Sequence, residues 1–386
     1  MNLADIFPKD GRSQRLYCET CGSSMDLRFD DFSELVSGVQ IDISDLPFLH
    51  CHKCETKALP DKSRFAIIQL HKQAAEKPSD KVTVKRSKIT EDFGFSKIPF
   101  LIDADDYFYI PGLYREHDVG FLTPLFFNKA VLTKYDNSPN YSVRFASPTY
   151  GDIDAEGFAI PFGINRFGKV IMWLGDIAKL PEAEQYYLRS ENVASDHSLG
   201  SEFYDAQIEC EFTEPPKERL VIGQRSNFLD AFEKKFGVRI SHLDMELVET
   251  ITALAPPLLD TEKERRHTFD SLNRIFIESL DNAGLEKLIK SIGATSAGSG
   301  SLKRLQAVLE TVDATGAVST LLSPFYVLYD LRIAYSHALS ARKKADLIDI
   351  SATRLGLAPD FDLPTVYDEL LNRIAASLKD LTDLVS

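Results

Sequence analysis

The 386-residue chain contains no apolar run that approaches the length of a membrane span, which for a helix is about 20 residues. Its first stretch, MNLADIFPKDGR, has no apolar core of the kind that a secretory signal needs. We therefore expect a cytoplasmic protein with no membrane partner. The remaining composition, 44% hydrophobic and 26% charged, is that of an ordinary soluble globular protein. The length predicts two or three domains.

The sequence also lacks internal repeats, and its glycines form neither a phosphate loop nor a dinucleotide-binding fingerprint. It has no excess of positive charge, because 58 Asp and Glu residues outnumber 44 Lys and Arg residues. Most of this acidic excess lies in residues 1–216, which argues against nucleic acid wrapping along that part. Residues 217–386 are nearly balanced and could present a local basic surface at Arg342, Lys343 and Lys344.

Cysteine is scarce, but four of the five cysteines form two CxxC pairs, Cys18 with Cys21 and Cys51 with Cys54. Two such pairs in a cytosolic chain predict a structural Zn²⁺ site, because each pair offers two thiolates to a tetrahedral ion. A redox dithiol or a disulfide pair is the alternative. A four-thiolate site is closed to substrate, so we do not expect it to be catalytic. Cys210 stands alone and is expected to be a small buried side chain.

The chain is predicted to be multidomain. Residues 1–75 contain the CxxC pairs and are predicted to form a small zinc ribbon, with a strand-containing insertion between the pairs. Residues 76–92 are polar and are predicted to be a linker or an exposed edge strand. Residues 93–216 are predicted to form an α+β sensing or regulatory domain, and residues 217–386 an all-helical bundle. The boundary before the bundle is set by Glu214 and the two prolines that follow it.

The region 93–216 consists of short aromatic-rich runs broken by Gly, Pro and Asp. The run 98–114 is partly strand-like. The clearest hairpin spans 158–177, with its turn between Asn165 and Gly168. Helices are expected over two segments, 180–189 and 201–210.

Beyond residue 217 the apolar residues recur at three- and four-residue steps, the spacing of amphipathic helices. A flexible connection is expected at 297–301. Helices are predicted over 227–236, 242–255, 261–280, 285–292, 302–312, 323–339, 346–357 and 363–385.

The predicted helix 323–339 is apolar almost all the way round, yet it contains Arg332 and His337. A helix without a clearly polar face is normally buried, and a buried guanidinium is costly unless it is paired or faces a wet cleft. Arg332 therefore either forms a structural ion pair, with Glu249 or Glu278 as candidate partners, or lines a site. In the first case His337 would simply pack in the core.

The sequence from Arg332 to His337 resembles the Arg-x4-6-His motif of HEPN domains, helical bundles many of which are metal-independent ribonucleases. The resemblance implies that Arg332 and His337 are catalytic. In an ideal helix, positions five apart point roughly 140° away from each other, so one helix does not easily aim both groups at one atom. The family arrangement, a composite cleft at a homodimer interface, would bring them together.

In the implied reaction the RNA 2′-hydroxyl attacks the adjacent phosphorus. His337 would act as general acid or base, because its unperturbed pKa lies near neutrality. Arg332 would hold the phosphate and stabilise the charge of the transition state. Four further side chains are expected to bind the substrate: Tyr335, Ser336, Arg342 and Lys343.

The resulting prediction is an endoribonuclease that acts as a toxin-like effector, in the manner of anti-phage abortive-infection systems. A phage-derived trigger or an antitoxin would then be a partner. The first alternative is a non-catalytic regulator that binds nucleic acid or protein and dimerises through the bundle; Ile333, directly after the arginine, favours it. The second alternative is a divalent-metal nuclease in the middle domain, assembled from Asp103, Asp105, Asp106, Asp152, Asp154, Asp196 and His197.

Overall fold

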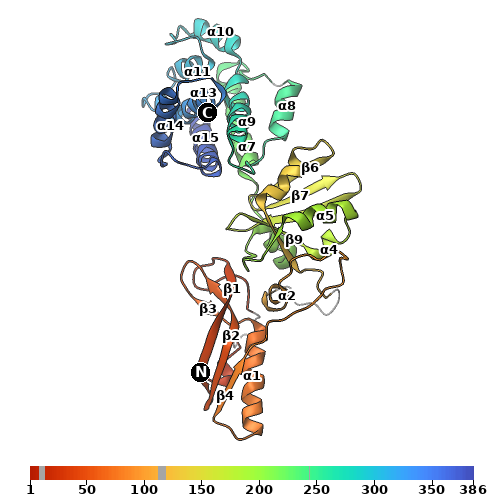
Figure 1. Cartoon of the computed structure of the whole chain (residues 1–386). Coiled ribbons are helices and arrows are strands. Elements are labelled where there is room, and N and C mark those ends of the chain that lie inside the picture. The colour runs from red at the N-terminus through yellow and green to blue at the C-terminus, as the bar shows by residue number, and fades with distance from the viewer. Residues whose placement is uncertain (8–13, 112–118, 243) are drawn as a thin grey trace. The chain divides into compact units, whose positions relative to one another are not determined.

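The computed structural model of the chain divides into two compact units, Met1–Glu214 and Pro215–Ser386 (Figure 1). The first unit contains two sheets with helices, and the second is helical. The chain is therefore multidomain, with an α+β part followed by a helical part, as the sequence predicts. The division falls at the predicted Glu214-Pro boundary. The structure describes four stretches of the chain: 1–7, 14–111, 119–242 and 244–386.

A long β-hairpin forms most of the first sheet. β1 (Met25–Val36) pairs antiparallel with β2 (Val39–Cys51), and the two strands are joined by Ser37 and Gly38. Both of these turn residues have positive φ, which suits the two-residue turns of right-twisted hairpins. The hairpin is the insertion expected between the two CxxC pairs. The short strand β3 (Lys57–Ala58) pairs with the end of β2.

The segment 76–92 is part of this sheet. It contributes β4 (Lys81–Lys85), which runs parallel to β2 and pairs with its first half. α1 (Asp61–Glu76) lies against β2 and β4 (Figure 1). The connection between α1 and the following region is thus an edge strand, the second of the two forms that the sequence allowed.

The second sheet is antiparallel, in the order β10-β5-β9-β8-β7-β6. The predicted hairpin is confirmed as β8 and β9. Its turn closes through a bond from the Gly168 N–H to the Asn165 carbonyl (2.9 Å), with Gly168 at φ 75°. The strands are β5 (Pro124–Asn128), β6 (Tyr141–Ser147), β7 (Tyr150–Ala155), β8 (Phe158–Ile164), β9 (Lys169–Trp173) and β10 (Asn192–Val193).

The helices that follow α1 in this unit are shorter than α1. Around the second sheet they are α2 (Ala104–Tyr109), α3 (Thr133–Asp136), α4 (Leu174–Ile177), α5 (Glu182–Glu191) and α6 (Glu202–Tyr204). Single helical turns complete the unit: η1 (Leu3–Asp5), η2 (Lys129–Leu132) and the π-helical η3 (Asp205–Glu209).

Two expectations in this unit are wrong. The strand-like run 98–114 contains α2, because the Asp103 carboxylate caps that helix by accepting from the Asp105 N–H (3.1 Å); residues 112–114 lie outside the described residues. Cys210 is exposed and ends η3 in the left-handed conformation, with φ 57°. In the run 98–114 the aromatic content suggested a strand, but the cap at Asp103 favours a helix. Cys210 shows that a small apolar side chain is not always buried.

The expected ribbon and the expected middle domain share one hydrophobic core. Cys18 and Cys51 belong to the same buried cluster as Ile171, Trp173 and Phe203. Trp173 is 1% exposed and its ring stacks on Phe203 at 4.9 Å. Residues 1–75 also have a buried cluster of their own, which includes Ile41 and Ile67, and the shared cluster around Cys18 and Cys51 joins them to the rest of the compact unit Met1–Glu214.

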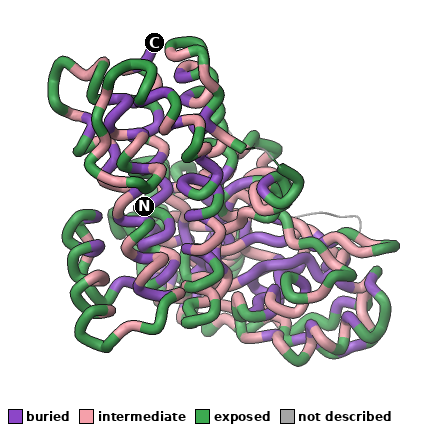
Figure 2. The backbone as a smooth tube through the Cα atoms, turned by 90° about the horizontal axis from the view of Figure 1, so that it is seen from above, coloured by how far each residue is buried: buried purple, intermediate pink, exposed green. Residues whose placement is uncertain are grey.

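The second unit is a helical bundle with its own continuous core. Along its helices, buried and exposed stretches alternate (Figure 2), as the apolar spacing predicts. α13, the helix that carries Arg332, packs against α9, α14 and α15. The helices are α7 (Lys217–Phe236), α8 (Met245–Thr252), α9 (Glu262–Asn273), α10 (Asn282–Ile292), α11 (Ser301–Leu309), α12 (Val318–Leu321), α13 (Ser323–Ser336), α14 (Ala341–Leu355) and α15 (Leu363–Val385), with the π-helical η4 (Arg274–Glu278) directly after α9.

The predicted helix 323–339 ends earlier than expected. α13 stops at Ser336, and His337 is extended, with φ −107° and ψ 149°. α14 begins after Ser340, whose side chain caps it, so the residues between the two helices are not helical. No helix in the described part of the chain has both the length and the apolar character that crossing a bilayer requires.

Candidate functional site

The four CxxC cysteines converge on one point. Their sulfur atoms all lie within 4.8 Å of one another, with 3.5 Å between Cys18 and Cys54 and 3.5 Å between Cys21 and Cys51. A tetrahedral Zn²⁺ with Zn–S bonds of about 2.3 Å separates its sulfurs by about 3.8 Å. The four thiols can therefore hold one metal ion, and the donor set is consistent with zinc.

Two turns of the same kind aim the thiols. The Gly22 N–H bonds to the Cys18 carbonyl (2.8 Å), and the Glu55 N–H bonds to the Cys51 carbonyl (3.0 Å). Both Gly22 and Glu55 adopt positive φ, of 71° and 59°. Glycine adopts this conformation without strain, and here it matches the turn that the sequence predicts. The second turn uses a glutamate instead.

The thiols are separate and differ in acidity. A disulfide needs sulfurs about 2.05 Å apart, and all five cysteines are unbridged, so the disulfide alternative does not hold. Burial raises the pKa of Cys51 to about 11. Burial acts in the same direction on Cys18, but bonds from the N–H groups of Cys21 and Thr20 lower its pKa to about 6. Metal binding must therefore displace a proton, at least from Cys51.

The acids proposed for a metal nuclease do not form a second metal site. Within the described stretches, the four cysteines are the only group of three or more such ligands close enough to share an ion. Each acid has another partner: Asp105 binds Arg86 through both oxygens (2.7 and 3.1 Å), and Asp106 binds His197 Nδ1 (2.6 Å). The others pair with Lys88 (Asp103), Arg144 (Asp152 and Asp154) and Asn165 (Asp196).

Arg332 and His337 come together within one chain. Because α13 ends at Ser336, the extended His337 folds back, and Arg332 Nη1 donates to His337 Nε2 at 2.8 Å. The sequence predicted both residues on one helix, which would not easily aim both groups at one atom. That prediction is wrong, because His337 lies beyond the end of α13. A dimer is not needed to bring the pair together, and homodimerisation stays a prediction.

This contact lies at a pocket of about 240 Å³, which we call the Arg332 pocket. The Arg332 side chain is 27% exposed, and His337 is exposed. The alternative in which Arg332 pairs with an acid is correct in part, because Glu278 lies 3.7 Å from it. His337, however, does not pack in the core. The pocket is lined by Asp270, Arg274, Glu278, Arg332, Ser336 and His337.

Asp270 holds two of these groups in place. Its Oδ1 accepts from Ser336 Oγ (2.8 Å) and from Arg332 Nε (3.3 Å). Ser336, predicted to bind substrate, therefore does lie beside Arg332. Asp270 comes from α9, more than 60 residues earlier in the chain, and the sequence did not point to it.

The other side of the pocket is formed by the π-helical segment η4, which carries Arg274 and Glu278. Its geometry shows in the bond from the Ser279 N–H to the Arg274 carbonyl (3.0 Å), five residues apart. π-Helical turns are rare and frequently occur at functional sites. Asp270, Arg274 and Glu278 follow one another at four-residue steps in the predicted helix 261–280, a polar stripe that could have identified them from the sequence.

The contact with Arg332 fixes the form of the His337 ring. A guanidinium has only donors, so His337 Nε2 must offer its lone pair and the proton must be on Nδ1. The Nε2 lone pair is thus engaged by Arg332 at the pocket. It can take a proton, the role of a general base, once the guanidinium turns to another acceptor.

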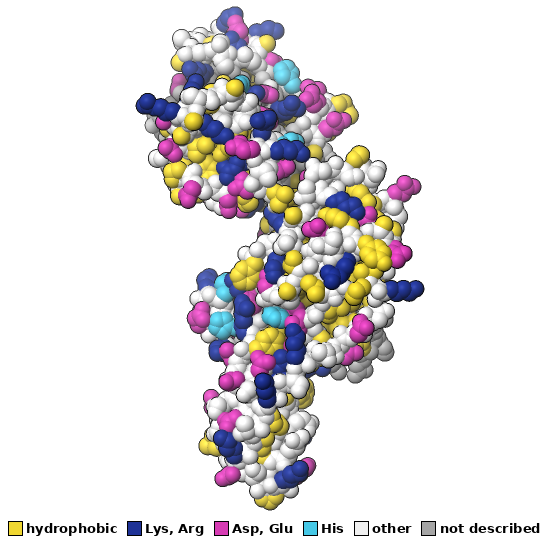
Figure 3. Space-filling view, viewed as in Figure 1, with side chains coloured by type: hydrophobic (Ala, Val, Ile, Leu, Met, Phe, Trp, Pro, Cys, Tyr) yellow, Lys and Arg dark blue, Asp and Glu magenta, His cyan; other side chains and the backbone are white. Residues whose placement is uncertain are grey.

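Three expected substrate-binding residues lie elsewhere. Tyr335 is buried, and its hydroxyl accepts from Arg265 Nη1 (2.7 Å). Arg342 and Lys343 are exposed in the first turn of α14 and do not line the Arg332 pocket. The break after α13 separates them from it. Figure 3 shows basic and acidic side chains interspersed over the visible face of the helical unit.

Comparison of the chain with protein-family models, with curated proteins and with solved structures finds no match in any of the three.

Proposed function

We propose that the Arg332 pocket is the active site of a metal-independent endoribonuclease. The observation that carries this proposal is the 2.8 Å contact between Arg332 and His337 at a solvent-open pocket. Arginine is the side chain best suited to holding a phosphate through two parallel bonds, and histidine is the side chain best suited to moving a proton near neutral pH. The resemblance to the HEPN motif supports the same reading.

The reaction is an internal transfer. A bound phosphate draws the Arg332 guanidinium away from His337 Nε2. The freed lone pair takes the proton of the ribose 2′-hydroxyl, and the resulting oxygen attacks the adjacent phosphorus. The bond from phosphorus to the 5′-oxygen breaks, leaving a 2′,3′-cyclic phosphate and a 5′-hydroxyl that takes a proton from water. The Arg332 guanidinium neutralises the charge that builds on the phosphate oxygens, while the Ser336 hydroxyl donates to Asp270.

Two carboxylates now hold Arg332, and we assign them different roles. Asp270 bonds to both Arg332 and Ser336 and so keeps them aligned; it is a positioning residue. Glu278 lies 3.7 Å from Arg332 Nη2 and is half-exposed. It also accepts a hydrogen bond from Asn273, which would still hold it if Arg332 moved away. A phosphate that binds Arg332 competes with Glu278 for the same guanidinium.

Glu278→Gln is therefore expected to tighten RNA binding. An exposed ion pair contributes at most about 1 kcal/mol, so the Kd for a non-cleavable 2′-deoxy oligonucleotide should fall about two- to fivefold. Asp270→Asn should instead weaken cleavage, because Arg332 and Ser336 lose their shared acceptor. Fluorescence anisotropy measures the first effect, with Glu286→Gln as control, since Glu286 pairs with Lys290 and Arg304 away from the pocket. Unchanged affinity in Glu278→Gln would contradict competition between Glu278 and a phosphate for Arg332.

The direct test is incubation of the purified protein with RNA in buffer without added divalent metal. Products with cyclic phosphate ends are expected. A toxin-like role in anti-phage abortive infection, with a phage-derived trigger or an antitoxin as partner, belongs to the same proposal. It predicts that expression arrests growth, and that His337→Ala relieves the arrest. Growth arrest that persists in His337→Ala would contradict that role.

A further inference from the structure

A second, larger cavity adjoins the Arg332 pocket. It measures about 570 Å³, and we call it the α8 cavity. Arg274 and Glu278 line both hollows, so the two lie side by side. Sites for small organic groups usually measure about 300–1,000 Å³. The α8 cavity is within this range, and the Arg332 pocket, at about 240 Å³, is large enough only for a small group such as a phosphodiester.

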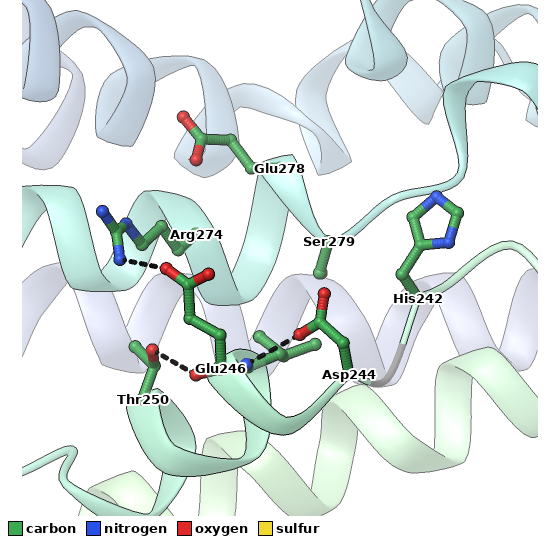
Figure 4. Close-up of a pocket in the computed structure, with 8 residues that line it drawn as sticks. His242, Asp244, Glu246, Thr250, Arg274, Glu278 and Ser279 are labelled. Carbon is green, nitrogen blue, oxygen red and sulfur yellow. Dashed lines mark hydrogen bonds and ion pairs between the residues drawn. The ribbon is translucent and has the colours of Figure 1, made fainter.

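The walls of the α8 cavity come from two elements. In Figure 4 the side chains of Asp244 and Glu246 rise from the start of α8 toward the segment that carries Arg274 and Glu278. Leu247 is buried and adds an apolar part to the wall. Among the described residues, the lining of the cavity is thus mainly polar, with Leu247 as its one aliphatic side chain.

The charge of the cavity excludes a phosphate. Three carboxylates line it, those of Asp244, Glu246 and Glu278, against one guanidinium, Arg274, which Glu246 already binds at 2.9 Å. His242, the remaining ionisable group in the lining, lies 3.6 Å from Asp281. Ionised carboxylates accept hydrogen bonds and cannot donate them. The cavity therefore favours a group that carries no negative charge and presents N–H donors.

We propose that the α8 cavity holds the nucleobase next to the scissile phosphate and selects bases with N–H donors, guanine above all. This inference rests on the proposed RNA cleavage. Unstacked bases are read on their Watson–Crick edges in single-stranded RNA. On that edge guanine carries two adjacent donors, N1–H and the 2-amino group, for which carboxylate oxygens are suitable acceptors. Uracil presents one N–H between two carbonyls, which carboxylates repel.

Asp244 is the residue best placed to read the base. One of its oxygens accepts from the Leu247 N–H (2.9 Å) and so caps α8, while no described residue donates to the second. Glu246 is held by Arg274. Asp244→Asn keeps the cap, because asparagine caps helices as well as aspartate does. It replaces the second acceptor oxygen with an amide donor, which guanine cannot bond.

The test uses DNA oligonucleotides that contain a single ribonucleotide, with each of the four bases placed in turn at the ribonucleotide and at the nucleotide after it. We expect kcat/KM to favour guanine over uracil at one of the two positions by about tenfold or more, within the range of one good base contact. Inosine, which lacks the 2-amino group, should lose most of this preference. Asp244→Asn should lose it too. Asp362→Asn, the same change at the cap of α15, should keep it.

The outcomes separate the two proposals. Equal cleavage of all chimeras by the wild-type protein would overturn the base selection and leave the ribonuclease in place. A guanine preference that survives Asp244→Asn would overturn the assignment to the α8 cavity. Each chimera has only one ribonucleotide that could react. If the protein cleaved none of the chimeras, both the proposed ribonuclease and this inference would be overturned.

Discussion

His337→Ala is expected to lower kcat for RNA cleavage about 100- to 10,000-fold, the range that a general acid or base contributes. His337 is exposed and lies after the end of α13, so its removal opens no cavity in the core. Circular dichroism and thermal melting of the variant should therefore match the wild type. The measurement is single-turnover cleavage of a short RNA with protein in excess, so that product release does not mask the chemical step.

Arg332→Lys provides the second arm of this prediction. Lysine keeps the positive charge but cannot form two parallel bonds to a phosphate. We therefore expect cleavage to fall strongly while weak RNA binding remains. The matched control is Arg354→Ala, because Arg354 is in the same bundle and pairs with Asp330 outside the pocket. If both pocket variants cleaved RNA like this control, the activity would belong to another site or to a contaminant.

Metal removal is expected to disrupt the Met1–Glu214 unit as a whole. Cys18 and Cys51 are in the same buried cluster as Trp173, the one tryptophan in the chain. Loss of a structural metal is among the few changes that exceed about 4 kcal/mol. For a unit of this size, that corresponds to a fall of about 8–16 °C in melting temperature. Trp173 emission should shift to longer wavelength on treatment with a strong chelator.

The two-unit division makes this result specific. The helical core contains no residue of the first unit, so most of the helical circular dichroism of Pro215–Ser386 should survive chelation. Cys51→Ser should reproduce the effect without chelator, and Cys210→Ser, at an exposed cysteine away from the cluster, should not. An unchanged Trp173 spectrum after verified metal loss would show that the cysteine cluster does not support the shared core.

The sequence predicted those structural elements that are determined by residues close together in the chain. The CxxC spacing predicted the thiolate cluster, and the Asn165–Gly168 turn predicted the β8–β9 hairpin, since both depend on residues next to one another. The bundle helices followed from apolar spacing. The shared core of the first unit could not be predicted in this way, because it joins residues far apart in the chain. Cys51 and Trp173, for example, belong to the same buried cluster.

The candidate site shows the same division. Arg332 and His337 were identified as candidates from their residue types and spacing, but the sequence did not predict how they are arranged in space. The apolar pattern continues to Leu339 without a glycine or proline to mark the end at Ser336. That end is what places His337 against Arg332. Asp270, which aligns Arg332, comes from another helix, and only the folded chain shows the pair.

The most direct measurement of the central claim is mass spectrometry of the products formed from an oligonucleotide with one ribonucleotide, in buffer without divalent metal. Attack by the 2′-hydroxyl predicts a single cut after that ribonucleotide, with a 2′,3′-cyclic phosphate on one fragment and a 5′-hydroxyl on the other, and no cut with His337→Ala. A 5′-phosphate, cleavage of the all-deoxy strand, or equal product from His337→Ala would contradict a site built on Arg332 and His337.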